Sequence, residues 1–177
     1  MVLQGKTNVY QTDLFSSLIH KIEQLGSCSY QEADEQKKAA FHVLADHVRS
    51  TSLIIADGGT PSNEGRGYVL RKIIRRAALF AQKITDNELL FPQLAEQYIE
   101  LMGQIFPELA LQKSYIIALL TSEIQRFSQN LSQGQQLFAK QIETLRLEKK
   151  QCIPGDQLFK LYDTYGFPLE LTRVLAT

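Results

Sequence analysis

The clearest chemistry in this chain lies in residues 56–76, which end in a group of basic side chains. On a helix of 3.6 residues per turn, five of these side chains share an arc of about 140°: Tyr68, Arg71, Lys72, Arg75 and Arg76. Apolar side chains occupy the opposite arc, so the helix would pack through one face and carry cations on the other. Arginine guanidinium groups bind phosphate oxygens in pairs, so the cationic face suits a phosphate backbone. A solvated face with ion-pair partners on neighbouring acidic helices is the structural alternative.

The loop before this helix contains four glycines: Gly58, Gly59, Gly65 and Gly67. Such residues allow a backbone to approach a partner closely, and a helix beginning near Gly65 would direct N–H groups towards an anion. The loop matches neither of two nucleotide motifs. A P-loop needs Gly-Lys-Ser/Thr, and a dinucleotide fingerprint needs glycine at Leu70 and a preceding strand.

Residues 158–172 contain a second unusual feature, the carboxylate of Asp163. It lies near the expected end of a helix, before Gly166 and between Tyr162 and Tyr165. The helix dipole disfavours a negative charge at this end, so Asp163 is a candidate functional residue. The structural alternative is a turn aspartate that bonds to the following backbone.

Other reactive side chains indicate neither a metal site nor a catalytic site. His42 and His47 are five residues apart, about 140° around a helix, and do not share a face. His20 is distant in the sequence, and Cys28 and Cys152 have no CxxC partner. We therefore expect free thiols, no bound metal and no catalytic residue.

Composition limits the function classes further. The chain has 177 residues, of which 19 are Lys or Arg and 19 are Asp or Glu. A net charge of zero excludes a generic polycation, so any nucleic-acid surface must be a local patch. The longest clearly apolar run, residues 115–120, is too short to span a bilayer, and no apolar leader is visible at Met1. We expect a cytoplasmic protein without a membrane partner.

Helical spacing of apolar residues extends through nearly the whole chain. It predicts an all-α fold: an irregular helical bundle with one very long helix and room for two sub-bundles, divided near residues 85–91 or at the Pro154 linker. The predicted helices cover residues 13–25, 32–56, 65–84, 91–105, 110–150, 156–165 and 169–177.

The first and the longest predicted helices have defined apolar faces. Thr12 would cap the N-terminus of the first helix and Gly26 its C-terminus. Its apolar stripe would be Leu14, Leu18, Ile22 and Leu25. The long helix would pack through seven residues: Ile117, Leu120, Ile124, Phe127, Leu131, Phe138 and Leu145.

Several of these segments together resemble the alanyl-tRNA synthetase family. The matching segments are residues 2–5 (VLQG), 12–15 (TDLF), 41–49 (FHVLADHVR), 55–58 (IADG), 61–76 (PSNEGRGYVLRKIIRR) and 158–168 (LFKLYDTYGFP). Residues 61–76 are highly specific, whereas residues 85–150 carry little signature. The resemblance implies that residues 1–30 end the aminoacylation core and that residues 31–177 form the helical tRNA-recognition domain.

The resemblance also implies roles for individual residues. Asn63 and Asp163 correspond to the Asn and Asp that read the G·U wobble pair of the tRNA acceptor stem. A carboxylate can accept from a guanine amino group, and a carboxamide can both donate and accept. The residues implied to hold the RNA backbone are Arg66, Tyr68, Arg71, Lys72, Arg75 and Arg76.

The family attaches alanine to its tRNA through an alanyl-adenylate, using ATP and magnesium, with zinc in an editing domain. This chain lacks the class II signatures of the catalytic core, the editing domain and the C-terminal domain. We therefore expect a fragment of the enzyme that carries no cofactor of its own and does not activate alanine. Its expected partners are alanine tRNA and the absent domains.

Two other functions fit parts of the sequence. A helical DNA- or RNA-binding regulatory module could read nucleic acid with residues 65–84, but it would not use Asp163 or prefer a G·U pair. A helical scaffold would show no salt-dependent RNA binding. The recognition hypothesis requires that the arginines are not buried in internal ion pairs and that Asn63 and Asp163 do not lie on opposite sides of the molecule. Either finding would overturn it.

Overall fold

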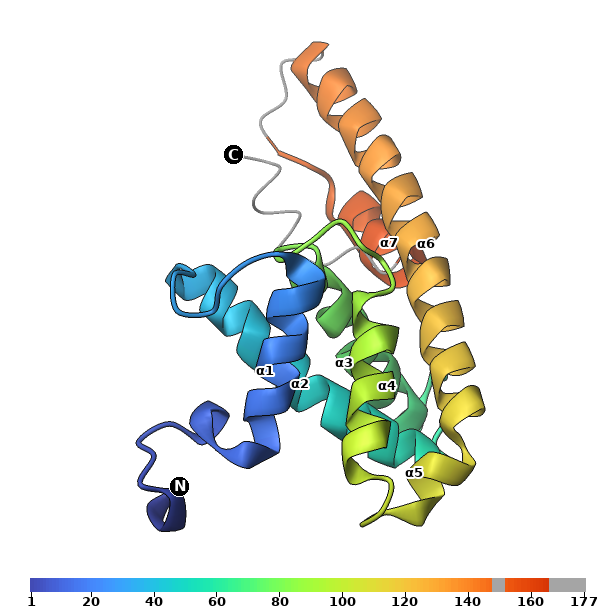
Figure 1. Cartoon of the computed structure of the whole chain (residues 1–177). Helices are drawn as coiled ribbons and strands as arrows, with labels where there is room; N and C mark the ends of the chain where they lie inside the picture. Colours follow the sequence, from blue (N-terminus) through green and yellow to red (C-terminus); the bar gives the residue numbers. More distant parts are fainter. Residues whose placement is uncertain (148–151, 166–177) are drawn as a thin grey trace. The chain divides into compact units, whose positions relative to one another are not determined.

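The computed structural model describes residues 1–147 and 152–165 (Figure 1). In these residues every regular element is helical, which confirms the all-α prediction. The chain groups into two compact units, Met1–Ile124 and Gln125–Thr177. The elements are η1 (Val2–Gln4), η2 (Val9–Gln11), α1 (Asp13–Gly26), α2 (Glu35–Ala56), α3 (Gly65–Ala81), α4 (Leu90–Met102), α5 (Pro107–Leu111), α6 (Lys113–Leu147) and α7 (Gly155–Tyr165).

The buried stripe of α1 differs from the predicted one. Its buried residues are Phe15, Leu18, Ile19 and Ile22, whereas Leu14 is 48% exposed. The predicted stripe is therefore rotated around the helix axis, towards Leu14 and away from Phe15 and Ile19. The helix packs against both α2 and α4, so the two neighbours together determine which arc is buried.

The ends of α1 also differ from the prediction. Thr12 occupies the N-cap position, but its hydroxyl donates to the Val9 carbonyl at 2.6 Å instead of capping the helix. The left-handed residue after the helix is Ser27, with φ of 51°, not Gly26. A Cβ added to Gly26 would lie 2.3 Å from Ile84 Cγ2, so glycine is used there for close packing.

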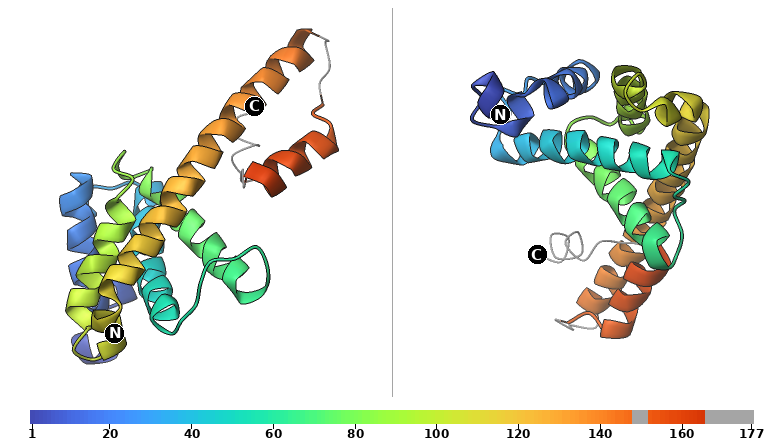
Figure 2. Two further views of the ribbon diagram at one scale, coloured as in Figure 1. Left: turned by 90° about the vertical axis from the view of Figure 1, so that its right-hand side faces the viewer. Right: turned by 90° about the horizontal axis from the view of Figure 1, so that it is seen from below.

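Helix α2 is the central element of the first unit, because it contacts α1, α3, α4 and α5 (Figure 2). It begins three residues later than predicted, since the Asp34 carboxylate accepts from the Lys37 backbone N–H at 2.7 Å and caps the helix. Its predicted apolar face is confirmed by five fully buried residues: Phe41, Leu44, Ala45, Val48 and Ile55.

The long helix is confirmed, with a later start than predicted. Pro107 opens the short separate helix α5, where its missing N–H costs no helical hydrogen bond. The Gln112 side chain then donates to the Ala56 carbonyl at 2.7 Å, and α6 begins at Lys113. With 35 residues, α6 is about 52 Å long at 1.5 Å per residue.

Six of the seven predicted apolar positions of α6 are buried, from Leu120 to Leu145. The remaining predicted position, Ile117, is not buried, and the neighbouring Ile116 is buried in its place. Helix α7 begins at Gly155, so Asp156, the predicted N-cap, lies within its first turn. The predicted helix at residues 169–177 lies outside the described residues.

Candidate nucleic-acid interface

Residues 57–64 form a tight loop between α2 and α3, and two glycines in and beside it have left-handed conformations. Gly58 has φ of 85° and Gly65 has φ of 58°, values that other residues rarely adopt. A Cβ on Gly67 would lie 2.4 Å from both the Thr60 carbonyl oxygen and Ser62 Oγ. The space at Gly67 is therefore filled by the chain itself, which corrects the expectation that this glycine admits a partner.

A similar internal contact explains Gly59. A Cβ there would lie 2.7 Å from the Ile54 carbonyl oxygen, which accepts a hydrogen bond from the Gly59 N–H at 2.8 Å. The Ser62 hydroxyl donates to the Glu64 carbonyl at 2.7 Å. These contacts fold the loop over the first turn of α3 and give Asn63 an exposed position within it.

Helix α3 has the two faces that the sequence predicts. Its buried residues are Leu70, Ile74, Ala77, Ala78 and Ala81, and the helix packs against α2 and α4. Around the helix axis, Arg71 and Arg75 are nearest to this buried arc, whereas Lys72 and Arg76 lie about 100° and 140° from Arg71. The cationic arc is thus divided into an inner and an outer half.

The inner half forms an ion-pair cluster with Glu123 of α6, which belongs to the same unit. The Nε atoms of Arg71 and Arg75 each lie 3.1 Å from Glu123 Oε1. The Glu123 side chain is only 6% exposed, and those of Arg71 and Arg75 are 14% and 22% exposed. Arg71 and Arg75 therefore make internal ion pairs, the arrangement that counts against the recognition hypothesis, because a buried carboxylate requires cationic partners.

The outer half remains at the surface. Lys72 and Arg76 are exposed, and so is Arg66 in the first turn of α3. The Lys72 ammonium lies 5.5 Å from the centre of the Tyr68 ring, and Tyr68 is itself 39% exposed. These side chains combine positive charge with an aromatic surface, which suits contact with phosphate and sugar groups.

Arg71 also connects the cluster to the loop. Its Nη1 donates to the side-chain oxygen of Asn63, and its Nη2 donates to the Pro61 carbonyl oxygen at 3.4 Å. The arginine thus holds the loop and α6 at once. Asn63, the first predicted reading residue, is exposed and is in contact with Arg71 of α3.

Sequence reasoning missed Glu123, although its position carries a signal. Leu120, Ile124 and Phe127 are buried positions of α6 at i, i+4 and i+7, and Glu123 occupies i+3 of the same face. An acidic residue at a core position indicates a buried cationic partner.

Asp163 lies in the last turn of α7, in the second unit, and its side chain lies outside the described residues. Asn63 lies in the first unit.

Tyr10, Tyr30 and His42 form a group of contacts within the first unit. His42 Nε2 lies 2.7 Å from the Tyr30 hydroxyl, and the His42 ring stacks on Tyr10 with 3.7 Å between centroids. The Tyr10 hydroxyl donates to Asp46 at 2.6 Å, and burial together with this carboxylate raises the pKa of Tyr10 to about 12. Burial lowers the pKa of His42 and, together with Arg76, that of His47.

Neither cysteine forms a disulfide. Over the described parts of the chain, no group of three His, Cys, Asp or Glu side chains could hold a metal ion. In the same residues, no helix is long and apolar enough to cross a membrane.

Comparison with known proteins tests the family resemblance. A family model described as tRNA synthetases class II (A) matches residues 1–177. The alanine–tRNA ligase of Rickettsia prowazekii is 44% identical over 172 residues, covering 97% of this chain and 19% of the relative. Those of Chlorobium phaeobacteroides and Bdellovibrio bacteriovorus are 40% and 39% identical, covering 99% and 98% of this chain and 20% of each relative.

This chain therefore spans about a fifth of the length of these relatives. The family model, by contrast, extends over the whole of it. The chain accordingly belongs to the family of class II (A) tRNA synthetases.

Proposed function

We propose that this chain is the part of an alanine–tRNA ligase that selects the tRNA, by binding the acceptor stem at its G·U wobble pair. The observation that carries the proposal is the exposed Asn63, held by Arg71 of α3, the helix that also carries the exposed cations Arg66, Lys72 and Arg76. The identity of about 40% to alanine–tRNA ligases supports the parent enzyme.

The outer half of the cationic arc, together with Arg66, suits a duplex RNA backbone. Arg66, Lys72 and Arg76 would contact phosphates and Tyr68 a sugar or phosphate, which sets the register without reading sequence. Arg71 and Arg75 lie beside them but are engaged with Glu123, so their main contribution is to hold the loop and α3 in place.

The reading residues are proposed to be Asn63 and Asp163. An A-form stem exposes base edges in a wide, shallow minor groove, and a G·U pair leaves the guanine amino group without its usual partner. A carboxylate such as Asp163 accepts from an amino group, and a carboxamide such as Asn63 has one donor and one acceptor group.

The parent enzyme would join alanine to tRNA through an alanyl-adenylate with ATP and magnesium, in the cytoplasm. Its catalytic, editing and C-terminal domains, the editing domain with zinc, would be supplied by other parts of the protein. In this proposal the present segment contributes tRNA selection and no catalytic group.

A binding measurement with two RNAs tests the proposal. Stem–loop RNAs that differ only by G·U or G·C at one position are titrated with the chain. We expect the G·U stem to bind about 5- to 150-fold more tightly, because one specific base-pair contact contributes about 1–3 kcal/mol. Equal, salt-dependent binding of both stems would instead favour a general nucleic-acid-binding module, and no binding would favour a scaffold.

A hybrid ligase provides the functional test. The matching segment of the Rickettsia prowazekii enzyme is replaced by this chain, with Asn63→Ala or Asp163→Ala. We expect slower aminoacylation of tRNA and nearly unchanged alanine-dependent ATP–pyrophosphate exchange. A parallel loss of both activities would show that the two residues support the fold instead.

A further inference from the structure

The buried carboxylate of Glu123 requires an explanation beyond stability. Taking a carboxylate and two guanidinium groups out of water is costly, and apolar residues of similar size often stabilise such a position equally well. Glu123 occupies a core position of α6, between Leu120 and Ile124, where an apolar side chain would fit the pattern. Its charge is therefore a candidate for a role in positioning.

The geometry of Arg71 shows what the carboxylate could position. Its three nitrogens face three different oxygens. Nε is ion-paired with Glu123 Oε1 of α6 at 3.1 Å, and the two Nη atoms donate to the Asn63 side-chain oxygen and the Pro61 carbonyl oxygen of the loop. A guanidinium group is planar and rigid, so fixing one edge on Glu123 also fixes the direction of the other nitrogens. Glu123 thus acts on the loop through one intermediate side chain.

The effect on Asn63 follows from its chemistry. A carboxamide has an oxygen that accepts and an NH2 group that donates, whereas arginine only donates. The Asn63 oxygen must therefore face Arg71, and the NH2 group is directed away from it. We propose that Glu123 is a positioning residue that, through Arg71, holds Asn63 with its NH2 group towards the RNA, so that the base pair must present an acceptor there. This inference rests on the proposed function.

The same carboxylate also controls how much positive charge is available. With Glu123 in place, Arg71 and Arg75 are held in the cluster, and the outer cations meet the RNA. Without that carboxylate, both arginines could bind phosphates of any stem. Glu123 would thus favour selective over non-selective binding.

The test is Glu123→Gln in the full 177-residue chain, titrated with the G·U and G·C stem–loops over a range of salt concentrations. We expect the preference for the G·U stem to fall at least fivefold. Binding of the G·C stem should strengthen, and its salt dependence should steepen by about 0.9 in log–log slope for each newly made phosphate contact. A residue with only a structural role would weaken binding to both stems and would not steepen the slope.

Two further variants complete the design. Glu143→Gln removes the same charge from an exposed position of α6 and should leave preference and slope unchanged. Arg71→Lys keeps Glu123 and the positive charge but removes the planar group. It should lose the G·U preference without the steeper slope, and it serves as the test if Glu123→Gln proves unfolded by circular dichroism.

The outcomes separate this inference from the proposed function. If the unaltered chain shows no G·U preference, the proposed function is wrong and the inference fails with it. If the unaltered chain prefers G·U but Glu123→Gln or a folded Arg71→Lys keeps the full preference, the recognition function stands and the positioning role is overturned.

Discussion

Arg71, Lys72, Arg75 and Arg76 are four cations within six residues, yet they have different environments. Arg71 and Arg75 are four residues apart and share the edge of α3 that faces Glu123. Lys72 and Arg76 are also four residues apart and share the exposed edge. Because i and i+4 positions lie on one face of a helix, the four residues act as two pairs. We expect the exposed pair, Lys72 and Arg76, to make most of the contacts with phosphate.

This division changes the prediction for salt dependence. The sequence by itself predicts that Arg75→Ala removes about one phosphate contact. In the structure we expect that effect for Lys72→Ala instead, with the slope of log K against log salt reduced by about 0.9. The measurement is a salt titration of stem–loop binding, with the exposed Lys140→Ala of α6 as control. An equal reduction for Arg75→Ala and Lys72→Ala would contradict the division.

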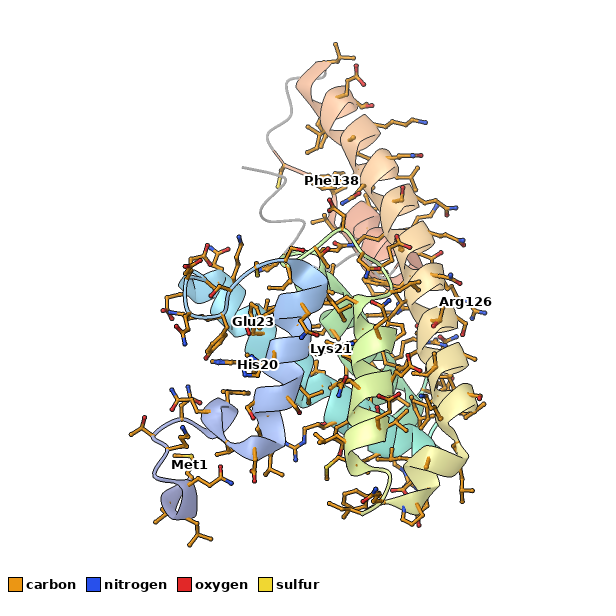
Figure 3. The ribbon with its side chains drawn as sticks, viewed as in Figure 1. Met1, His20, Lys21, Glu23, Arg126 and Phe138 are labelled. Atoms are coloured by element: carbon orange, nitrogen blue, oxygen red, sulfur yellow. The ribbon has the colours of Figure 1, made fainter. Side chains whose placement is uncertain are left out.

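At the scale of elements, each helix is defined by which arc its neighbours cover. Helix α1 shows this, because Leu14 and Leu18 are the same residue type one turn apart, and their exposed fractions are 48% and 0%. His20 and Glu23, shown in Figure 3, lie on the same helix with 2.9 Å between Nδ1 and Oε2. The apolar positions alone predicted one stripe containing both leucines. Packing against both α2 and α4 buries Phe15 and Ile19 in place of Leu14.

The two leucines provide a matched pair of variants. We expect Leu18→Ala to lower the free energy of unfolding by about 2–5 kcal/mol, because it removes buried methyl groups and leaves a cavity. Leu14→Ala should change it by about 0.5 kcal/mol or less, as an exposed substitution does. Urea denaturation followed by circular dichroism measures both values. Similar losses for the two variants would show that the predicted stripe is the correct one.

At the scale of the whole molecule, a net charge of zero leaves local groups to determine the response to pH. The pKa values of His42 and His47 are lowered below 6.5, first of all by burial. The folded chain then binds protons less readily than the unfolded chain at these sites. Their contribution to stability is complete above about pH 6.5 and is lost as the pH falls towards the folded pKa values. The Glu23 carboxylate accepts from the Tyr30 N–H, which lowers its pKa, so its contribution to stability is lost in turn as the pH falls below about 4.5.

We therefore expect the urea concentration at the midpoint of unfolding to decrease as the pH is lowered from 7 to 5. Circular dichroism measures this midpoint without any ligand. Replacing both His42 and His47 with Gln should flatten this dependence. The control is His20→Gln, whose side chain is 73% exposed. A pH dependence that persists undiminished in the double variant would show that other groups are responsible.

The sequence by itself determined the all-α fold, the two faces of α3, the buried face of α2 and the family resemblance, because hydrophobic periodicity records the angular position of each residue around its own helix. It did not determine which helix lies next to each face. The tertiary structure decided that Arg71 and Arg75 meet Glu123, that Gly67 is needed for contact with Thr60, and that Asn63 is held by Arg71. These contacts join residues from different elements, and the spacing of residues within one element carries no information about its neighbour.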